Sequence, residues 1–146
     1  MHFITGGSFN GKAKWVCEQY GVNKFSNLWI SAFKGSPMPN PSDRQFSDGV
    51  IVFEGIEYWV EDLLIYSEQE QILTRWREFL QGWQEWEKEH IERKVVLIGT
   101  DITKGIVPIG SDERKRRDVT GRVFQMTAKA SSQMDLIWYG ISQKIK

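Results

Sequence analysis

Short apolar runs alternate with amphipathic stretches along the chain. The near-continuous apolar runs VIVF (50–53) and VVLI (95–98) are typical of parallel strands that are covered on both faces. The pattern predicts strands at Phe3–Thr5, Leu28–Phe33, Val50–Glu54, Val95–Gly99 and Leu136–Tyr139, and helices at Lys12–Tyr20, Glu57–Tyr66, Glu70–Glu92 and Glu113–Ser131. This alternation predicts an α/β fold in which a mostly parallel sheet carries helices on both faces.

The helix expected at Glu70–Glu92 has a wide apolar stripe. Its large apolar residues recur at intervals of three and four, at Ile72, Trp76, Phe79, Leu80 and Trp83. This spacing predicts packing against the sheet. Trp86 lies off the stripe, so the pattern leaves open whether it joins the core or a subunit contact.

One segment interrupts the alternation. Gly35–Asp43 holds three of the four prolines of the chain, and proline lacks a backbone donor and has a fixed φ. We therefore expect a loop between two strands, near the carboxyl edge of the sheet where ligands of such folds bind.

Composition narrows the class of protein. The chain of 146 residues is short enough for one domain spanning 1–146, and its 19 basic and 19 acidic side chains cancel, which argues against nucleic acid or a membrane surface as a partner. The basic run at 114–117 is spread around a helix, and it can form either a solvated face or phosphate or subunit contacts. With a single cysteine and no long apolar N-terminal run, we expect a cytoplasmic protein.

The first predicted strand runs into a glycine-rich turn. Its residues match the phosphate-loop pattern G-x-x-x-x-G-K-[ST] except at the last position, and they are Gly6, Gly7, Ser8, Phe9, Asn10, Gly11, Lys12 and Ala13. Such a loop wraps backbone N–H groups around a phosphate while the lysine meets the outer phosphates. The pattern predicts a nucleotide-binding loop, with a plain turn between strand and helix as the alternative.

Four further stretches resemble a known family in order along the chain. Val50–Leu64 is similar to its strand and D/E-C-L/I-T, W-x-T-N-L-L element, and Val95–Pro108 to its strand and N-E-V-G-x-G-I-V-P signature. Residues 117–125 resemble its F-R-D-x-x-G-R-x-N-Q helix, and residues 140–146 resemble its terminal segment. The chain thus resembles a divergent, shortened member of the adenosylcobinamide kinase / adenosylcobinamide-phosphate guanylyltransferase family.

The resemblance implies a P-loop fold that works in cobalamin biosynthesis or salvage. Family members phosphorylate adenosylcobinamide with ATP or GTP and then transfer GMP to that phosphate, so nucleotide and corrinoid are the implied ligands. The resemblance also implies assembly as a homo-oligomer. By position, the implied catalytic residues are Lys12, Glu54 and Asp101, and Glu54 and Asp101 are candidate magnesium ligands. Further nucleotide contacts are implied at Ser31, Ala32, Phe33 and Glu54.

Two departures from the family pattern bear on activity. The family's guanylylated histidine has no counterpart in Gly35–Asp43, and the only histidines are His2 and His90, so we expect the guanylyltransferase activity to be lost. Ala13 lacks the hydroxyl that holds Mg²⁺ in the intact loop. Two hypotheses stay open: an adenosylcobinamide kinase-like enzyme, or a non-catalytic nucleotide- or corrinoid-binding subunit or regulator.

Overall fold

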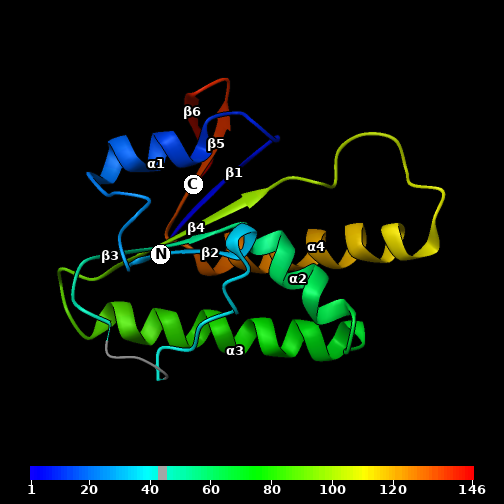
Figure 1. Ribbon diagram of the computed structural model, residues 1–146, viewed down its shortest axis with the longest axis horizontal. Helices are drawn as coiled ribbons and strands as arrows, with labels where there is room; N and C mark the ends of the chain where they lie inside the picture. Colours follow the sequence, from blue (N-terminus) through cyan, green and yellow to red (C-terminus); the bar gives the residue numbers. More distant parts are fainter. Residues whose placement is uncertain (43–45) are drawn as a thin grey trace.

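In the computed structural model, which describes residues 1–42 and 46–146, six strands form one sheet in the order β2-β3-β4-β1-β5-β6 (Figure 1). Strands β1 to β5 are parallel, and β6 pairs antiparallel with β5. The strands are β1 (His2–Gly6), β2 (Trp29–Ser31), β3 (Val50–Glu54), β4 (Lys94–Thr100), β5 (Gln133–Trp138) and β6 (Ile141–Lys144). The predicted α/β class with a mostly parallel sheet is confirmed.

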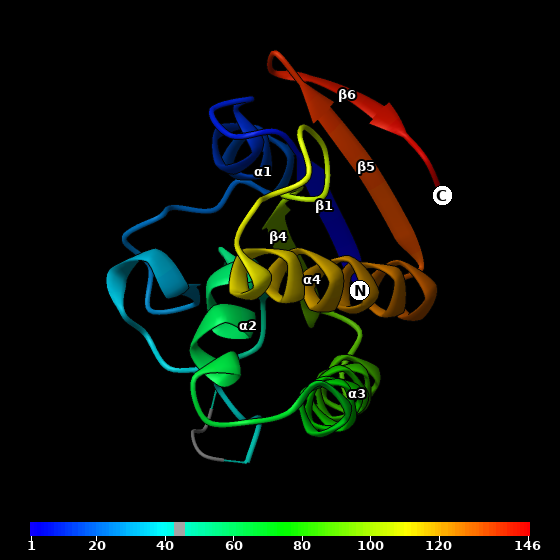
Figure 2. The same ribbon diagram turned by 90° about the vertical axis from the view of Figure 1, so that its right-hand side faces the viewer.

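Helices cover both faces of the sheet (Figures 1 and 2). One face packs against α1 (Lys12–Tyr20), and the other against α2 (Ile56–Leu64), α3 (Gln69–Lys88) and α4 (Ser111–Ala130). A 3₁₀ turn, η1 (Ala32–Lys34), follows β2. Within the described ranges no helix combines the length and apolar character needed to cross a membrane.

The larger core lies beneath α2, α3 and α4 and is rich in aromatic rings. The apolar stripe of α3 is buried as predicted, and the Trp83 ring lies 4.7 Å from the Phe53 ring, centre to centre. Trp86 is also buried, and the guanidinium of Arg93 lies 4.7 Å from the centre of its ring. Within this chain, therefore, Trp86 belongs to the core rather than to an exposed subunit contact.

The proline-rich loop is attached to this core by two indoles. Trp59 Nε1 donates to the Ser36 carbonyl at 2.7 Å, and Trp83 Nε1 donates to the Pro39 carbonyl at 3.3 Å. These bonds satisfy indole N–H groups that burial removes from water. The predicted loop at Gly35–Asp43 is confirmed for its described residues, and Asp43 lies outside them.

Several predicted boundaries differ from the structure by a few residues, and two of them have a clear physical cause. The strand expected at Leu28–Phe33 ends at Ser31, because the chain turns into η1 and the Gly35 N–H bonds the Ala32 carbonyl. The helix expected at Glu70–Glu92 ends at Lys88, and a turn in which the Arg93 N–H bonds the His90 carbonyl leads into β4. Strand β6 was not predicted, because its short, mostly polar sequence ISQK has no apolar alternation.

Replacement of a core tryptophan should be far more costly than replacement of a surface one. Trp83→Ala removes a fully buried ring and should lower the free energy of unfolding by about 3–5 kcal/mol, as large-to-small core substitutions do. The matched control Trp138→Ala removes a ring that is 54% exposed and should cost less than about 1 kcal/mol. Urea denaturation measures both, and equal losses would contradict this account of the core.

Candidate functional site: a glycine-rich loop and its cavity

The glycine-rich turn lies at a strand-to-helix junction, as the motif requires. Strand β1 ends at Gly6, and α1 begins at Lys12 directly after Gly11, which has a φ of 84°. The first backbone N–H groups of a helix carry partial positive charge and attract anions. Glycine is needed at position 6, where a Cβ would stand 2.2 Å from the Ile137 carbonyl oxygen.

The loop is held from outside by the turn that joins β5 to β6. The Asn10 side chain accepts a hydrogen bond from the Tyr139 N–H at 3.1 Å, and the Asn10 carbonyl accepts one from the Gly140 N–H at 2.9 Å. Tyr139 and Gly140 both have positive φ, which brings their N–H groups into this tight turn. The unpredicted β5–β6 hairpin therefore fixes the middle of the predicted loop.

Lys12 is buried and folds back against its own loop. Only 8% of the residue is exposed, and Nζ donates to the Gly7 carbonyl at 2.7 Å and to the Gly6 carbonyl at 3.2 Å. Burial lowers the pKa of Lys12, while the carboxylates of Glu57 and Glu54 oppose that shift. The ammonium group thus lies at the loop with an incomplete set of hydrogen-bond acceptors.

A cavity of about 560 Å³ opens beside Lys12. Its walls come from the loop, the end of β3, the start of α2, the end of β4 and one residue of α4. Of the predicted nucleotide-binding residues, the structure brings Ser8, Phe9, Asn10, Gly11, Lys12, Ala13, Phe33 and Glu54 to this cavity. Gly6 and Gly7 contribute carbonyl groups that bind Lys12, whereas Ser31 and Ala32 do not line it.

The side of the cavity away from the loop is partly aromatic. The Phe33 and Tyr58 rings meet edge to face with centres 4.7 Å apart, and the guanidinium of Arg116 lies 5.9 Å from the centre of the Tyr58 ring. Phe33 remains half exposed, so one face of this pair is open to a planar ligand. A phosphate loop at one end and exposed rings at the other suit a nucleotide better than free phosphate.

Glu57 is a site residue that the sequence reasoning missed. It is 1% exposed, its Oε2 accepts a hydrogen bond from the Thr100 N–H at 3.0 Å, and it lines the cavity with Lys12. Burial raises its pKa, although the bond from Thr100 and the charge of Lys12 oppose the shift. The available signal was a carboxylate on the same helical face as Val60 and Leu64, in an otherwise apolar stripe.

The structure separates the two predicted acidic ligands. Glu54 lines the Lys12 cavity, where its Oε2 accepts a hydrogen bond from Trp29 Nε1 at 2.9 Å. Asp101 lines a second cavity and accepts bonds from the backbone N–H and the hydroxyl of Thr103, at 2.9 and 2.6 Å. Burial would raise the pKa of Asp101, but the hydrogen bonds from Thr103 and the charge of Lys104 outweigh it and lower the pKa.

The carboxylates at the Lys12 cavity offer a limited site for magnesium. In the part of the chain that the structure describes, no three or more His, Cys, Asp or Glu side chains gather as a metal site. Glu54 and Glu57 are the two carboxylates that line the cavity. Mg²⁺ commonly uses one or two carboxylates together with phosphate oxygens and water, so these residues fit an ion that arrives with a nucleotide.

Both histidines lie away from the loop, near the amino-terminal ends of the strands. His2 begins β1, and its ring nitrogens bond Tyr20 Oη at 2.5 Å and Asp135 Oδ2 at 2.7 Å. His90 is exposed shortly before β4 begins, and its Nε2 lies 3.7 Å from Asp48 Oδ2. The phosphate loop follows the carboxyl end of β1, at the opposite edge of the sheet.

The buried carboxyl group of Glu57 should make stability depend on pH. Its pKa is raised above the usual 4.5, so its stabilising contribution is present below that value and is lost as pH rises through the folded-state pKa. Glu57→Gln stays neutral at every pH. Between about pH 4 and about pH 7, the Tm of this variant should therefore rise relative to wild type. Thermal unfolding of both proteins across this range measures the change.

Glu78→Gln on the exposed face of α3 is the control, and its Tm difference from wild type should stay constant with pH. A constant difference for Glu57→Gln as well would contradict the burial of this charge.

Comparison with known proteins places the chain in a family. Two bifunctional adenosylcobalamin biosynthesis proteins, from Escherichia coli (strain K12) and Salmonella typhimurium (strain LT2), are each 43% identical over 53 residues, which is 36% of this chain. The matched stretch spans 29% of the length of each of these relatives. The model of the cobinamide kinase / cobinamide phosphate guanyltransferase family matches residues 38–145, a range that begins after the phosphate loop. Since that range covers most of the chain, the protein belongs to the cobinamide kinase / cobinamide phosphate guanyltransferase family.

Proposed function

We propose that this protein transfers a phosphoryl group from ATP or GTP to adenosylcobinamide, in cobalamin biosynthesis or salvage. The observation that carries the proposal is the position of Lys12, whose ammonium group is held at the carbonyls of a loop between β1 and α1. Family membership supports the chemistry. The strand–loop–helix geometry supports phosphate binding at a segment outside the range that the family model matches.

In this proposal the loop residues Gly6 to Ala13 surround the outer phosphates with backbone N–H groups. Lys12 leaves the Gly6 and Gly7 carbonyls and neutralises the charge that develops on the transferred group. The rings of Phe33 and Tyr58 contact the base. A magnesium ion that arrives with the nucleotide would supply positive charge to offset the charge of the phosphates. Glu54 would hold it, and water would take the place of the hydroxyl that Ala13 lacks.

The alternative is a nucleotide- or corrinoid-binding subunit without catalytic activity. One observation favours it in particular. The buried carboxyl group of Glu57 lines the same cavity as Lys12, and when ionised it competes with a phosphate for that ammonium group and repels the incoming anion. Assembly as a homo-oligomer and organisation as a single domain are part of both proposals.

Lys12→Ala should abolish most nucleotide binding. Loss of a buried, charged hydrogen-bond donor to phosphate costs roughly 1.5–3 kcal/mol, so the Kd for ATP or GTP should rise about 10- to 100-fold. Calorimetric titration with each nucleotide, with and without Mg²⁺, measures this. The matched control is Lys88→Ala on the exposed end of α3, which should bind as wild type does. An unchanged Kd in Lys12→Ala would mean that the loop does not hold the phosphates.

The two proposed roles differ in turnover. If the protein is a kinase, incubation with adenosylcobinamide and γ-labelled nucleotide yields labelled corrinoid phosphate, and Lys12→Ala does not. Nucleotide binding without transfer to the corrinoid would support the non-catalytic subunit instead.

We also propose that guanylyl transfer is lost. The guanylyl transfer that the family resemblance implies proceeds through a guanylylated histidine. Here His2 and His90 both lie near the amino-terminal ends of the strands, at the edge of the sheet opposite to the loop. Incubation with α-labelled GTP should therefore leave no acid-labile label on the protein. A covalent adduct that maps to either histidine would overturn this conclusion.

A further inference from the structure

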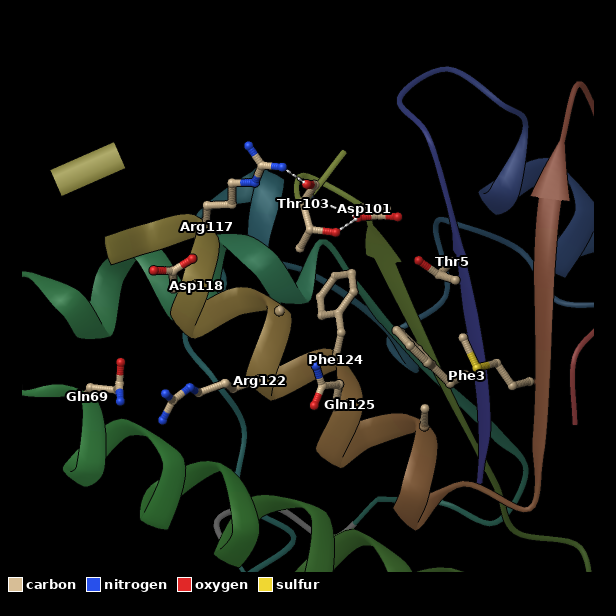
Figure 3. Close-up of a pocket in the computed structure, with 13 residues that line it drawn as sticks. Phe3, Thr5, Gln69, Asp101, Thr103, Arg117, Asp118, Arg122, Phe124 and Gln125 are labelled. Carbon is tan, nitrogen blue, oxygen red and sulfur yellow. Dashed lines mark hydrogen bonds between the residues drawn. The ribbon is translucent and has the colours of Figure 1, made fainter. Parts of the chain in front are cut away.

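A second cavity, of about 590 Å³, lies between α4, the start of α3, β1 and the segment after β4 (Figure 3). One face of α4 supplies much of its wall, because Arg117, Gly121, Gln125 and Ala128 follow one another at intervals of three and four residues. Apolar side chains form a floor, and these are Phe3, Phe124 and Met134. The proposed nucleotide site uses none of these residues.

The two cavities share a wall that is one segment of backbone thick. Thr100 lines the nucleotide cavity and the next residue, Asp101, lines the second. The Gly6 carbonyl accepts hydrogen bonds from Lys12 Nζ at 3.2 Å and from the Asp101 N–H at 3.1 Å. A ligand in the second cavity would therefore lie directly behind the group that anchors Lys12. Transfer needs the reacting groups about 3–3.5 Å apart, so the two ligands would have to meet over the outer rim of this wall and not through it.

Several polar groups at this cavity have hydrogen-bonding capacity to spare. Thr5 is 7% exposed, and its Oγ1 has no hydrogen-bond partner among the described residues. Figure 3 shows Thr5 between Asp101 and Phe3. The Arg122 and Gln125 side chains form no hydrogen bond or ion pair within the described ranges. Arg117, in contrast, is committed to the carbonyls of Thr103 and Ile106, where it holds the segment after β4.

The charges around the cavity balance. Arg117 and Arg122 are matched by Asp101 and Asp118, so the lining offers no net attraction to a second polyphosphate. Gln69 and Gln125 each present a donor and an acceptor, which complement the same two groups of a primary amide. An apolar floor with amide partners at its rim fits an uncharged ligand that carries amide groups on a large apolar framework, which describes the periphery of a corrinoid.

We propose that the second cavity binds the amide-bearing rim of the corrinoid substrate and directs its phosphate-accepting arm past Thr5 and over the rim of the shared wall into the nucleotide cavity. This inference rests on the proposed function and names the place of its second substrate. Gln125 and Arg122 bind peripheral amides, Phe3 and Phe124 contact the apolar framework, and the Thr5 hydroxyl bonds the arm.

Equilibrium dialysis of dicyanocobinamide against the full chain tests this, with corrinoid absorbance as the readout and nucleotide present at saturation. Gln125→Ala and Arg122→Ala change exposed residues of a helix in which alanine is well tolerated, so both variants should fold. Each should weaken corrinoid binding about 10-fold, the loss of one hydrogen bond to the ligand. Thr5→Val, which keeps the shape of the side chain, should also weaken it.

Nucleotide affinity is the second readout and should stay at the wild-type value in all three variants. Arg77→Ala, on an exposed position of α3 away from the cavity, is the matched control and should bind both ligands normally. Wild-type corrinoid affinity in Gln125→Ala and Arg122→Ala would overturn the cavity assignment and leave the proposed function standing. Nucleotide binding without any corrinoid binding by the wild type would overturn both. Corrinoid binding that the variants weaken, in a protein that binds no nucleotide, would support the cavity and overturn phosphoryl transfer.

Discussion

The site depends on the hydrogen bonds that hold the buried ammonium group of Lys12. It lies between the carbonyls of Gly6 and Gly7, on the helix side of a turn that cannot carry a side chain at Gly6. Removing such a charge from water is costly unless polar partners surround it. Two carbonyls and the nearby carboxylates offset part of that cost, and an incoming phosphate would offset more. Burial of Lys12 is therefore consistent with the anion binding that we propose for this loop.

Elements from later in the chain hold this arrangement in place. The turn between β5 and β6 binds Asn10 in the middle of the loop, and the segment after β4 binds the Gly6 carbonyl through Asp101. Arg117 of α4 in turn fixes that segment. Since each of these contacts joins residues far apart in sequence, the shape of the loop and of its two flanking cavities depends on the completed sheet.

Ala13, which departs from the family pattern, and Glu57, which the sequence reasoning missed, both change the surroundings of Lys12. Ala13 removes one oxygen from the loop, while Glu57 adds a buried carboxyl group that accepts a hydrogen bond from the Thr100 N–H beside Lys12. Its raised pKa means that the neutral form is favoured more than in water. The balance of charge at Lys12 thus distinguishes the kinase hypothesis from the binding-subunit hypothesis better than family membership does. Function depends on the site and not on the fold.

Much of the architecture was readable from local pattern. Continuous apolar runs marked β3 and β4, the spacing from Ile72 to Trp83 marked α3, and two glycines with Lys12 marked the loop, because periodicity and turn chemistry act over a few residues. The resemblance located the remaining candidate residues. The positions of these residues along the sequence did not show which of them line the same cavity.

Those questions were decided by tertiary contacts. The course of the chain after β4, where the Asp101 N–H bonds the Gly6 carbonyl, placed Asp101 in a different cavity from Glu54. The core enclosed Trp86, and the packing of α2 buried Glu57 beside Lys12. Strand β6 had no apolar pattern of its own, so its pairing with the predicted strand β5 became visible only in the structure. Local sequence determines which backbone conformations are favoured, whereas burial and the pairing of distant polar groups exist only once the sheet has brought them together.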